Sequence, residues 1–192
     1  MNKKADSSEN VVKLKQGSSA DAPARRKGIY LLPNLLTTGA LFAGFYAVLS
    51  GFTGQFELAA IAIFAAMIFD GLDGRVARMT NTQSDFGVQY DSLSDMVSFG
   101  VAPAVVAYGW GVSDLGKLGL AAAFVYASCA ALRLARFNVQ AESSDGKVFT
   151  GLPSPAAAAL VAGFVWSTYE LAPSVALSVL GAVLTAAAGL LM

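Results

Sequence analysis

The sequence predicts an all-α integral membrane protein with about six transmembrane helices. Of its 192 residues, 55% are hydrophobic and only 14% are charged, and the mean hydropathy is +0.57. A soluble domain carries about 25% charged residues, so this chain is far too apolar for that class. Histidine is absent from the sequence, which excludes histidine-dependent catalytic triads and histidine-ligated zinc.

Residues 1–29 are predicted to form a disordered, basic tail outside the membrane. This segment contains seven lysines and arginines against three acidic residues, and it has little apolar surface to bury. It lacks the apolar core of a cleaved signal peptide. The cluster Arg25, Arg26 and Lys27 precedes the first apolar stretch, so the positive-inside rule predicts a cytoplasmic N-terminus. Contact with anionic lipid headgroups is a second role that the same cluster could have.

The transmembrane catalytic domain is expected to cover residues 30–192. Its helices are expected at residues 30–51, 56–79, 85–110, 117–137, 155–169 and 173–192, each bounded by a short polar or glycine- and proline-containing link. Pro103 predicts a bend in the third helix. A six-span count places five basic residues on the N-terminal side of the membrane, namely Arg75, Arg78, Arg133, Arg136 and Lys147. Only Lys117 falls opposite, which supports this topology.

The second and third expected helices carry four aspartates in otherwise apolar surroundings. Asp70, Asp73, Gly74, Ala77 and Arg78 follow the spacing i, i+3, i+4, i+7 and i+8, which is one helical face. In the third helix a similar stripe contains Ser84, Gly87, Asp91, Asp95 and Ser98. An ionisable group at membrane depth costs roughly 2.5–3.5 kcal/mol, so these faces are expected to look inward and to carry function.

If the two helices fold into a hairpin about residues 82–83, residues whose numbers sum to about 165 lie at equal depth. Asp70 then faces Asp95, and Asp73 faces Asp91, in the cytoplasmic half of the membrane. Four carboxylates without histidine or cysteine favour magnesium, manganese or calcium. Four such groups can hold two divalent ions, an arrangement that suits the clamping of a phosphoryl or pyrophosphate group.

The four aspartates also fit two alternative roles. They could belong to a proton relay or a cation pathway, which makes a divalent-cation or proton transporter the non-enzyme alternative. They could instead form structural ion pairs with Arg75 and Arg78, although two arginines cannot neutralise four acids.

The pattern D-x-x-D-G-x-x-A-R, followed after eight residues by G-x-x-x-D-x-x-x-D, resembles the signature of the CDP-alcohol phosphotransferases. Here it runs from Asp70 to Arg78 and continues with Gly87, Asp91 and Asp95. The segments PNLLT, SDMVSFGVAPA, RLARFN and FTGLPSP are similar to the phosphatidylserine synthase branch of that family. This resemblance covers about residues 28–165.

The resemblance implies a six-helix enzyme of the cell (inner) membrane, usually a homodimer, with its site open to the cytoplasm. Two magnesium or manganese ions would be bound by Asp70, Asp73, Asp91 and Asp95, and Asp95 would also be the general base. CDP-diacylglycerol would be bound by Asn34, Thr37, Gly74, Arg78 and Ser84. The implied reaction moves the phosphatidyl group to the hydroxyl of L-serine and releases CMP.

Arg133 and Arg136 are the candidate residues for recognising the acceptor. They lie at i and i+3, hence on one helical face, and arginine binds carboxylates in a bidentate way. Glycerol 3-phosphate or an inositol phosphate would also suit two arginines, so the chemistry alone leaves the acceptor open. The resemblance favours serine, and the remaining interpretation is that both residues mark the cytoplasmic boundary.

Overall fold

The computed structural model describes residues 25–82, 84–142, 151–171 and 174–192, so the expected tail lies outside it up to residue 24. The described elements are α1 (Arg25–Phe52), α2 (Phe56–Thr80), α3 (Asp85–Asp95), the π-helical segment η1 (Met96–Val101), α4 (Ala102–Trp110), the 3₁₀ turn η2 (Val112–Leu115), α5 (Lys117–Glu142), α6 (Ser154–Thr168) and α7 (Val175–Leu190). All regular structure in these ranges is helical, which confirms the predicted all-α class.

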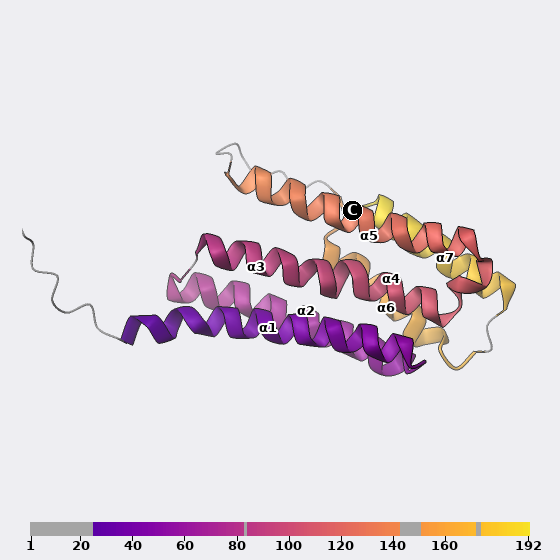
Figure 1. Ribbon diagram of the computed structural model, residues 1–192, viewed down its shortest axis with the longest axis horizontal. Helices are drawn as coiled ribbons and strands as arrows, with labels where there is room; N and C mark the ends of the chain where they lie inside the picture. The colour runs from indigo at the N-terminus through magenta and orange to yellow at the C-terminus, as the bar shows by residue number, and fades with distance from the viewer. Residues whose placement is uncertain (1–24, 83, 143–150, 172–173) are drawn as a thin grey trace, which may run out of the picture.

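The helices form an elongated bundle in which α3, η1 and α4 make one continuous rod (Figure 1). Within the described ranges, the bounds of the helices agree closely with those expected from the sequence. Helix α1 begins earlier than expected, at Arg25, so the basic cluster before residue 30 forms its first turn. Helix α1 packs along α2, and α5 packs along α7. In Figure 1, α6 and α7 flank only the half of the bundle nearest the α1–α2 turn.

The core of this bundle is built mostly from small side chains, and most of the large apolar ones face outward. Most buried apolar residues are alanines, whereas phenylalanines and leucines such as Phe42, Phe124 and Leu132 are exposed. This distribution suits a protein in lipid, where close backbone packing drives helix association and apolar side chains contact hydrocarbon. Two helices, over Leu32–Phe52 and Lys117–Val139, are long and apolar enough to cross a membrane alone, and α6 and α7 are shorter apolar helices.

The link between α2 and α3 is tight because two residues complete the hydrogen bonding of the helix ends. Asn81 takes a left-handed conformation with φ 50°, and its N–H reaches the Ala77 and Arg78 carbonyls. Ser84 caps α3 by accepting a 3.0 Å hydrogen bond from the Gly87 N–H. These two ends turn the chain back on itself and bring the acidic parts of α2 and α3 to similar depth.

The rod that contains α3 is joined to α1 by serine side chains. Ser94 Oγ donates to the Thr37 carbonyl at 3.1 Å, and Ser98 Oγ donates to the Ala40 carbonyl at 3.0 Å. Opposite Ser98, a Cβ added to Gly44 would lie 2.7 Å from the Ser98 Cα, so only glycine permits this approach. The contact holds the end of α3 firmly against α1.

The helix that contains Pro103 changes its hydrogen-bond pattern just before the proline, in the π-helical segment η1. In this segment the Ala102 N–H bonds to the Val97 carbonyl, five residues back rather than four. A proline lacks the N–H of an α-helical bond, and its ring crowds the carbonyl four residues earlier. The wider π turn is therefore found where the proline disturbs the regular helix.

Candidate functional site

Three of the four predicted carboxylates gather between α2 and α3. Asp70, Asp91 and Asp95 each offer one oxygen, and these oxygens lie within 4.8 Å of one another. All three side chains are half-buried. Counting 1.5 Å per residue back from the end of α2, Asp70 lies about 15 Å from the α2–α3 link.

Asp73 occupies a different environment beside this group. It is buried, with 4% of its surface exposed, and the Thr37 hydroxyl donates to its Oδ2 at 2.7 Å. The same threonine oxygen lies 3.1 Å from the Pro33 carbonyl, and the Thr37 carbonyl accepts from Ser94. Thr37 thus connects α1 to both acidic helices. The structure therefore gives a compact group of three, and Asp73 lies beside it with its carboxylate bonded to α1.

The donor set of the three grouped aspartates fits a hard divalent cation. Magnesium and calcium bind oxygen ligands at about 2.0–2.6 Å, so two ligands on one ion are at most about 5.2 Å apart. The 4.8 Å spread of the three oxygens satisfies this limit before any side-chain adjustment. Carboxylates this close repel one another unless a cation lies between them. Asp70, Asp91 and Asp95 could therefore hold such an ion.

The two arginines of α2 do not support a purely structural role for the acids. Arg75 and Arg78 are both exposed. The Arg78 Nε donates to the Gly74 carbonyl of its own helix at 2.9 Å. This contact leaves the rest of the guanidinium, with its additional donors, available at the surface beside the acidic face.

The two glycines on the acidic faces have different surroundings. A Cβ added to Gly74 would meet nothing within 4 Å, so its surface is open. At Gly87 an added Cβ would lie 3.2 Å from Ser84 Oγ and 3.6 Å from Asn34 Oδ1. Asn34 and Ser84 therefore converge at the start of α3, where polar atoms of α1 and α3 border the open surface.

Arg133 and Arg136 lie on the same end of α5, where polar contacts join α5 to α3. Ser92 Oγ donates to Asn138 Oδ1 at 3.0 Å, which brings this end of α5 beside the helix of Asp91. Arg133 is half-buried, and its Nη1 donates to the Met192 carbonyl at 2.8 Å. Arg136 is exposed. The printed contact of Arg133 thus goes to the end of α7, and the acceptor-binding role of the two arginines stays a prediction.

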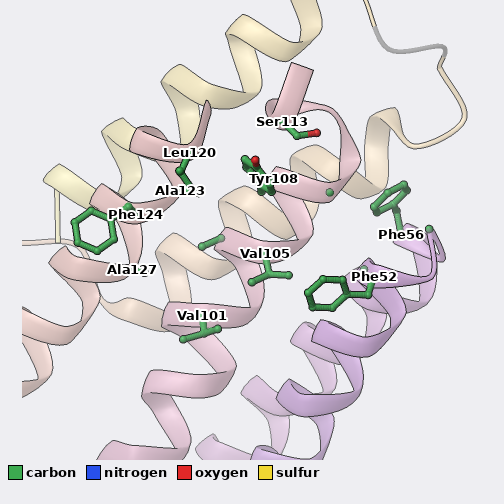
Figure 2. Close-up of a pocket in the computed structure, with 14 residues that line it drawn as sticks. Phe52, Phe56, Val101, Val105, Tyr108, Ser113, Leu120, Ala123, Phe124 and Ala127 are labelled. Carbon is green, nitrogen blue, oxygen red and sulfur yellow. The ribbon is translucent and has the colours of Figure 1, made fainter. Parts of the chain in front are cut away.

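A separate apolar cleft of about 550 Å³ opens at the other end of the bundle. Figure 2 shows Phe52 and Phe56 of the α1–α2 turn on one side, Phe124 and Leu120 of α5 on the other, and Val105 and Tyr108 of α4 between them. Among the described residues that line it, none has a carboxylate or basic side chain. The cleft therefore suits hydrocarbon rather than a charged group.

Several polar contacts around the site were not predicted from the sequence, among them those of Ser94, Ser92 with Asn138, and Tyr126. Tyr126, which is buried in α5, donates to the Phe99 carbonyl at 2.9 Å. The available signal was the occurrence of serines four residues apart and of a single tyrosine in an apolar helix, since polar residues in such helices often bond across to a neighbouring helix.

Comparison with known proteins shows a family match over most of the chain. The family described as CDP-alcohol phosphatidyltransferase matches residues 30–190. A CDP-diacylglycerol–serine O-phosphatidyltransferase of Helicobacter pylori is 45% identical over 133 residues, which are 69% of this chain and 56% of that protein. A protein of the same name from Methanocaldococcus jannaschii is 50% identical over 102 residues, or 53% of this chain and 47% of that protein.

A third relative carries a different name. An archaetidylserine synthase of Methanothermobacter thermautotrophicus is 41% identical over 135 residues, which are 69% of this chain and 57% of that protein. The chain spans about half the length of the curated relatives it matches.

Proposed function

The chain belongs to the CDP-alcohol phosphatidyltransferase family, and from that premise we propose that it transfers the phosphatidyl group of CDP-diacylglycerol to the hydroxyl of L-serine and releases CMP. The observation that carries the proposal is the convergence of Asp70, Asp91 and Asp95 within a membrane helix bundle. The names of the relatives support serine as the acceptor.

The grouped aspartates and Asp73 would hold two magnesium or manganese ions. When bound, the ions supply positive charge that neutralises the pyrophosphate of the donor and makes its phosphorus more electrophilic. Asp73 contributes from its buried position, where the Thr37 hydroxyl orients its carboxylate. Carboxylates that bind a metal commonly also accept a hydrogen bond from a neighbouring protein group, as Asp73 does from Thr37.

The donor would lie over the open surface between α2 and the start of α3. Gly74 allows the nucleotide to approach the helix backbone because nothing occupies the space above it. Arg78, with its guanidinium at the surface, binds the diphosphate, and Asn34 and Ser84 bind the cytidine part at the α1–α3 border. Thr37, which the resemblance assigns to donor binding, acts through Asp73 instead.

Asp95 is the general base of the proposed reaction. It accepts the proton of the serine hydroxyl while the hydroxyl oxygen forms a bond to the phosphorus that bears the diacylglycerol. The bond between that phosphorus and the bridging oxygen of the pyrophosphate breaks, and CMP leaves with the electron pair. Asp70, which has a carboxylate oxygen within 4.8 Å of one of Asp95, is the neighbouring group on α2.

Arg133 and Arg136 would bind the carboxylate of serine. Both project from the end of α5 that the Ser92–Asn138 hydrogen bond fixes beside α3. A bidentate arginine–carboxylate contact would orient the hydroxyl toward Asp95. Glycerol 3-phosphate and inositol phosphate are the competing acceptors, because a phosphate satisfies the same two side chains.

The site would open to the cytoplasm at the inner membrane, with the N-terminus on the same side. Basic residues lie in the last turns of α2 and toward the end of α5, in line with the positive-inside rule. We also expect a homodimer. The proposed reaction steps depend on neither the orientation nor the dimer.

The deciding experiment measures CMP release from CDP-diacylglycerol by the purified protein with serine, glycerol 3-phosphate or inositol phosphate. We expect release with serine, and loss of turnover in Asp95→Asn. Asp85→Asn is the matched control because Asp85 is an exposed aspartate in the first turn of the same helix. Faster release with another acceptor would reject serine, and manganese or proton flux into liposomes without CDP-lipid would favour a transporter.

A further inference from the structure

The segment η1 contains a carbonyl, that of Phe99, which lacks the backbone N–H donor it would have in a regular α-helix. In an α-helix the N–H of residue 103 would bond to the carbonyl of Phe99, four residues earlier. Residue 103 is proline and has no N–H to donate. The Phe99 residue is fully buried, so water cannot replace the missing donor.

The missing donor is supplied from another helix. Tyr126 of α5 is completely buried, and its hydroxyl donates to the Phe99 carbonyl at 2.9 Å. A buried backbone acceptor left without a partner is costly, and a tyrosine hydroxyl in an apolar core normally has a specific partner. Pro103 and Tyr126 are thus two halves of one arrangement, although they lie on different helices.

This arrangement is next to the acidic group. Asp95 immediately precedes η1, and Phe99 follows it by four residues, about one helical turn. We propose that Tyr126 is a positioning residue for the carboxylate group: by satisfying the Phe99 carbonyl in place of Pro103, it holds η1 in the π form that orients Asp95 toward Asp70 and Asp91. The catalytic meaning of this orientation rests on the proposed function, but its test by cation binding does not.

The π form matters because both sides of η1 are anchored. On one side, Ser94 Oγ bonds to the Thr37 carbonyl of α1 and fixes the end of α3. On the other side, Val106 and Trp110 hold α4 in the core. One residue more or fewer in the turn between them rotates one side against the other by about 100°. In the observed π register α4 lies in the core while Asp95 faces Asp70 of α2.

The first test replaces Tyr126 by phenylalanine, which keeps the ring and removes only the hydroxyl. The readout is manganese binding to the full-length purified protein, measured by electron paramagnetic resonance without CDP-lipid. Loss of a supporting contact around a metal site typically weakens binding 10- to 100-fold, and we expect at least about a tenfold loss. The control is Thr185→Val, which removes a buried hydroxyl that bonds to the Gly181 carbonyl on α7.

Thr185→Val should bind manganese like the parent protein. A tenfold loss in Tyr126→Phe alone supports the proposal. Unchanged binding in Tyr126→Phe, or equal losses in both variants, overturns it, because any effect would then be a general consequence of removing a buried hydroxyl.

The second test restores the donor on the helix itself. Pro103→Ala returns an N–H at position 103 that can bond to the Phe99 carbonyl, while the anchors on both sides, Ser94 on α1 and the buried Val106 and Trp110, keep the π turn before it. This variant should therefore retain manganese binding, and adding Tyr126→Phe to it should have little further effect. Losses that simply multiply in the double variant, or loss of binding in Pro103→Ala alone, would refute the role of the Phe99 carbonyl. If Tyr126→Phe fails to fold, the double variant still tests the proposal, because its Phe99 carbonyl can accept a hydrogen bond from the N–H at position 103.

The two proposals fail separately. If serine does not release CMP but the manganese results hold, the proposed reaction is wrong and the positioning role stands. If serine releases CMP while Tyr126→Phe binds manganese normally, only the positioning role is wrong.

Discussion

Replacing Thr37 by valine separates two roles for this residue, because the hydroxyl either orients Asp73 or contacts the lipid donor. In the structure the hydroxyl donates to Asp73 Oδ2 at 2.7 Å, and both side chains are buried. Valine has nearly the same shape, so the substitution removes the hydrogen bond and leaves the packing of α1 on α2 in place.

The size of the effect follows from the charge and burial of the acceptor. A hydrogen bond to a charged group contributes about 1.5–3 kcal/mol, and Asp73 is 4% exposed, so water cannot take the place of the hydroxyl. At about 1.4 kcal/mol per tenfold change, we expect divalent-cation affinity to fall about 10- to 150-fold. The KM for CDP-diacylglycerol at saturating cation should stay near its parent value.

The assay titrates manganese against the purified variant, and then measures CMP release over a range of CDP-diacylglycerol at saturating manganese. Thr38→Val is the matched control, because Thr38 is the next residue, is exposed, and shares its 2.9 Å hydrogen bond with Tyr90 rather than with an acid. A raised KM for the lipid with unchanged manganese affinity would refute the orienting role and return Thr37 to donor binding.

Three more substitutions and one treatment probe the packing and the site. Gly44→Ala should lower the unfolding temperature, because its Cβ would lie 2.7 Å from the Ser98 Cα, at a cost of about 1–3 kcal/mol; unchanged melting would show that α1 can shift there. Gly74→Ala should leave melting unchanged, since nothing lies within 4 Å of the added Cβ, but should raise the KM for CDP-diacylglycerol; an unchanged KM would place the donor elsewhere. Removal of divalent cations by a chelator should stop CMP release, and magnesium or manganese should restore it; turnover that persists in the chelator would exclude the metal-dependent reaction. Arg136→Ala should raise the KM for serine more than that for the lipid, and equal changes would remove Arg136 from the acceptor site.

The helices could be predicted because their physical causes are local in the sequence. Apolar stretches of membrane length and short polar links placed the rods within a few residues of their observed ends. The gathering of Asp70 with Asp95 also followed from local rules, since helical periodicity and the tight α2–α3 link bring them to equal depth. These features depend on one helix or on one hairpin.

Contacts between more distant helices could not be predicted in the same way. Hairpin pairing alone makes the four aspartates equivalent, but Asp73 differs because α1 packs against α2 and presents Thr37 to it. The π form of η1 likewise depends on Tyr126, which lies 27 residues after Phe99 and on another helix. Periodicity carries no information about which helix faces which, so such partners require the three-dimensional packing.

The alanine-rich core has a mechanical consequence for a protein in a bilayer. Small side chains offer almost no rotamer freedom, so the interior cannot adapt to strain by repacking. A bilayer that is thicker or thinner than the apolar length of the helices must then be met by tilting of whole helices or by deformation of the lipid. The rigid core would thus keep the aspartates in a fixed relative geometry. The large, flexible side chains on the outside of the bundle would adapt to changes in the surrounding lipid.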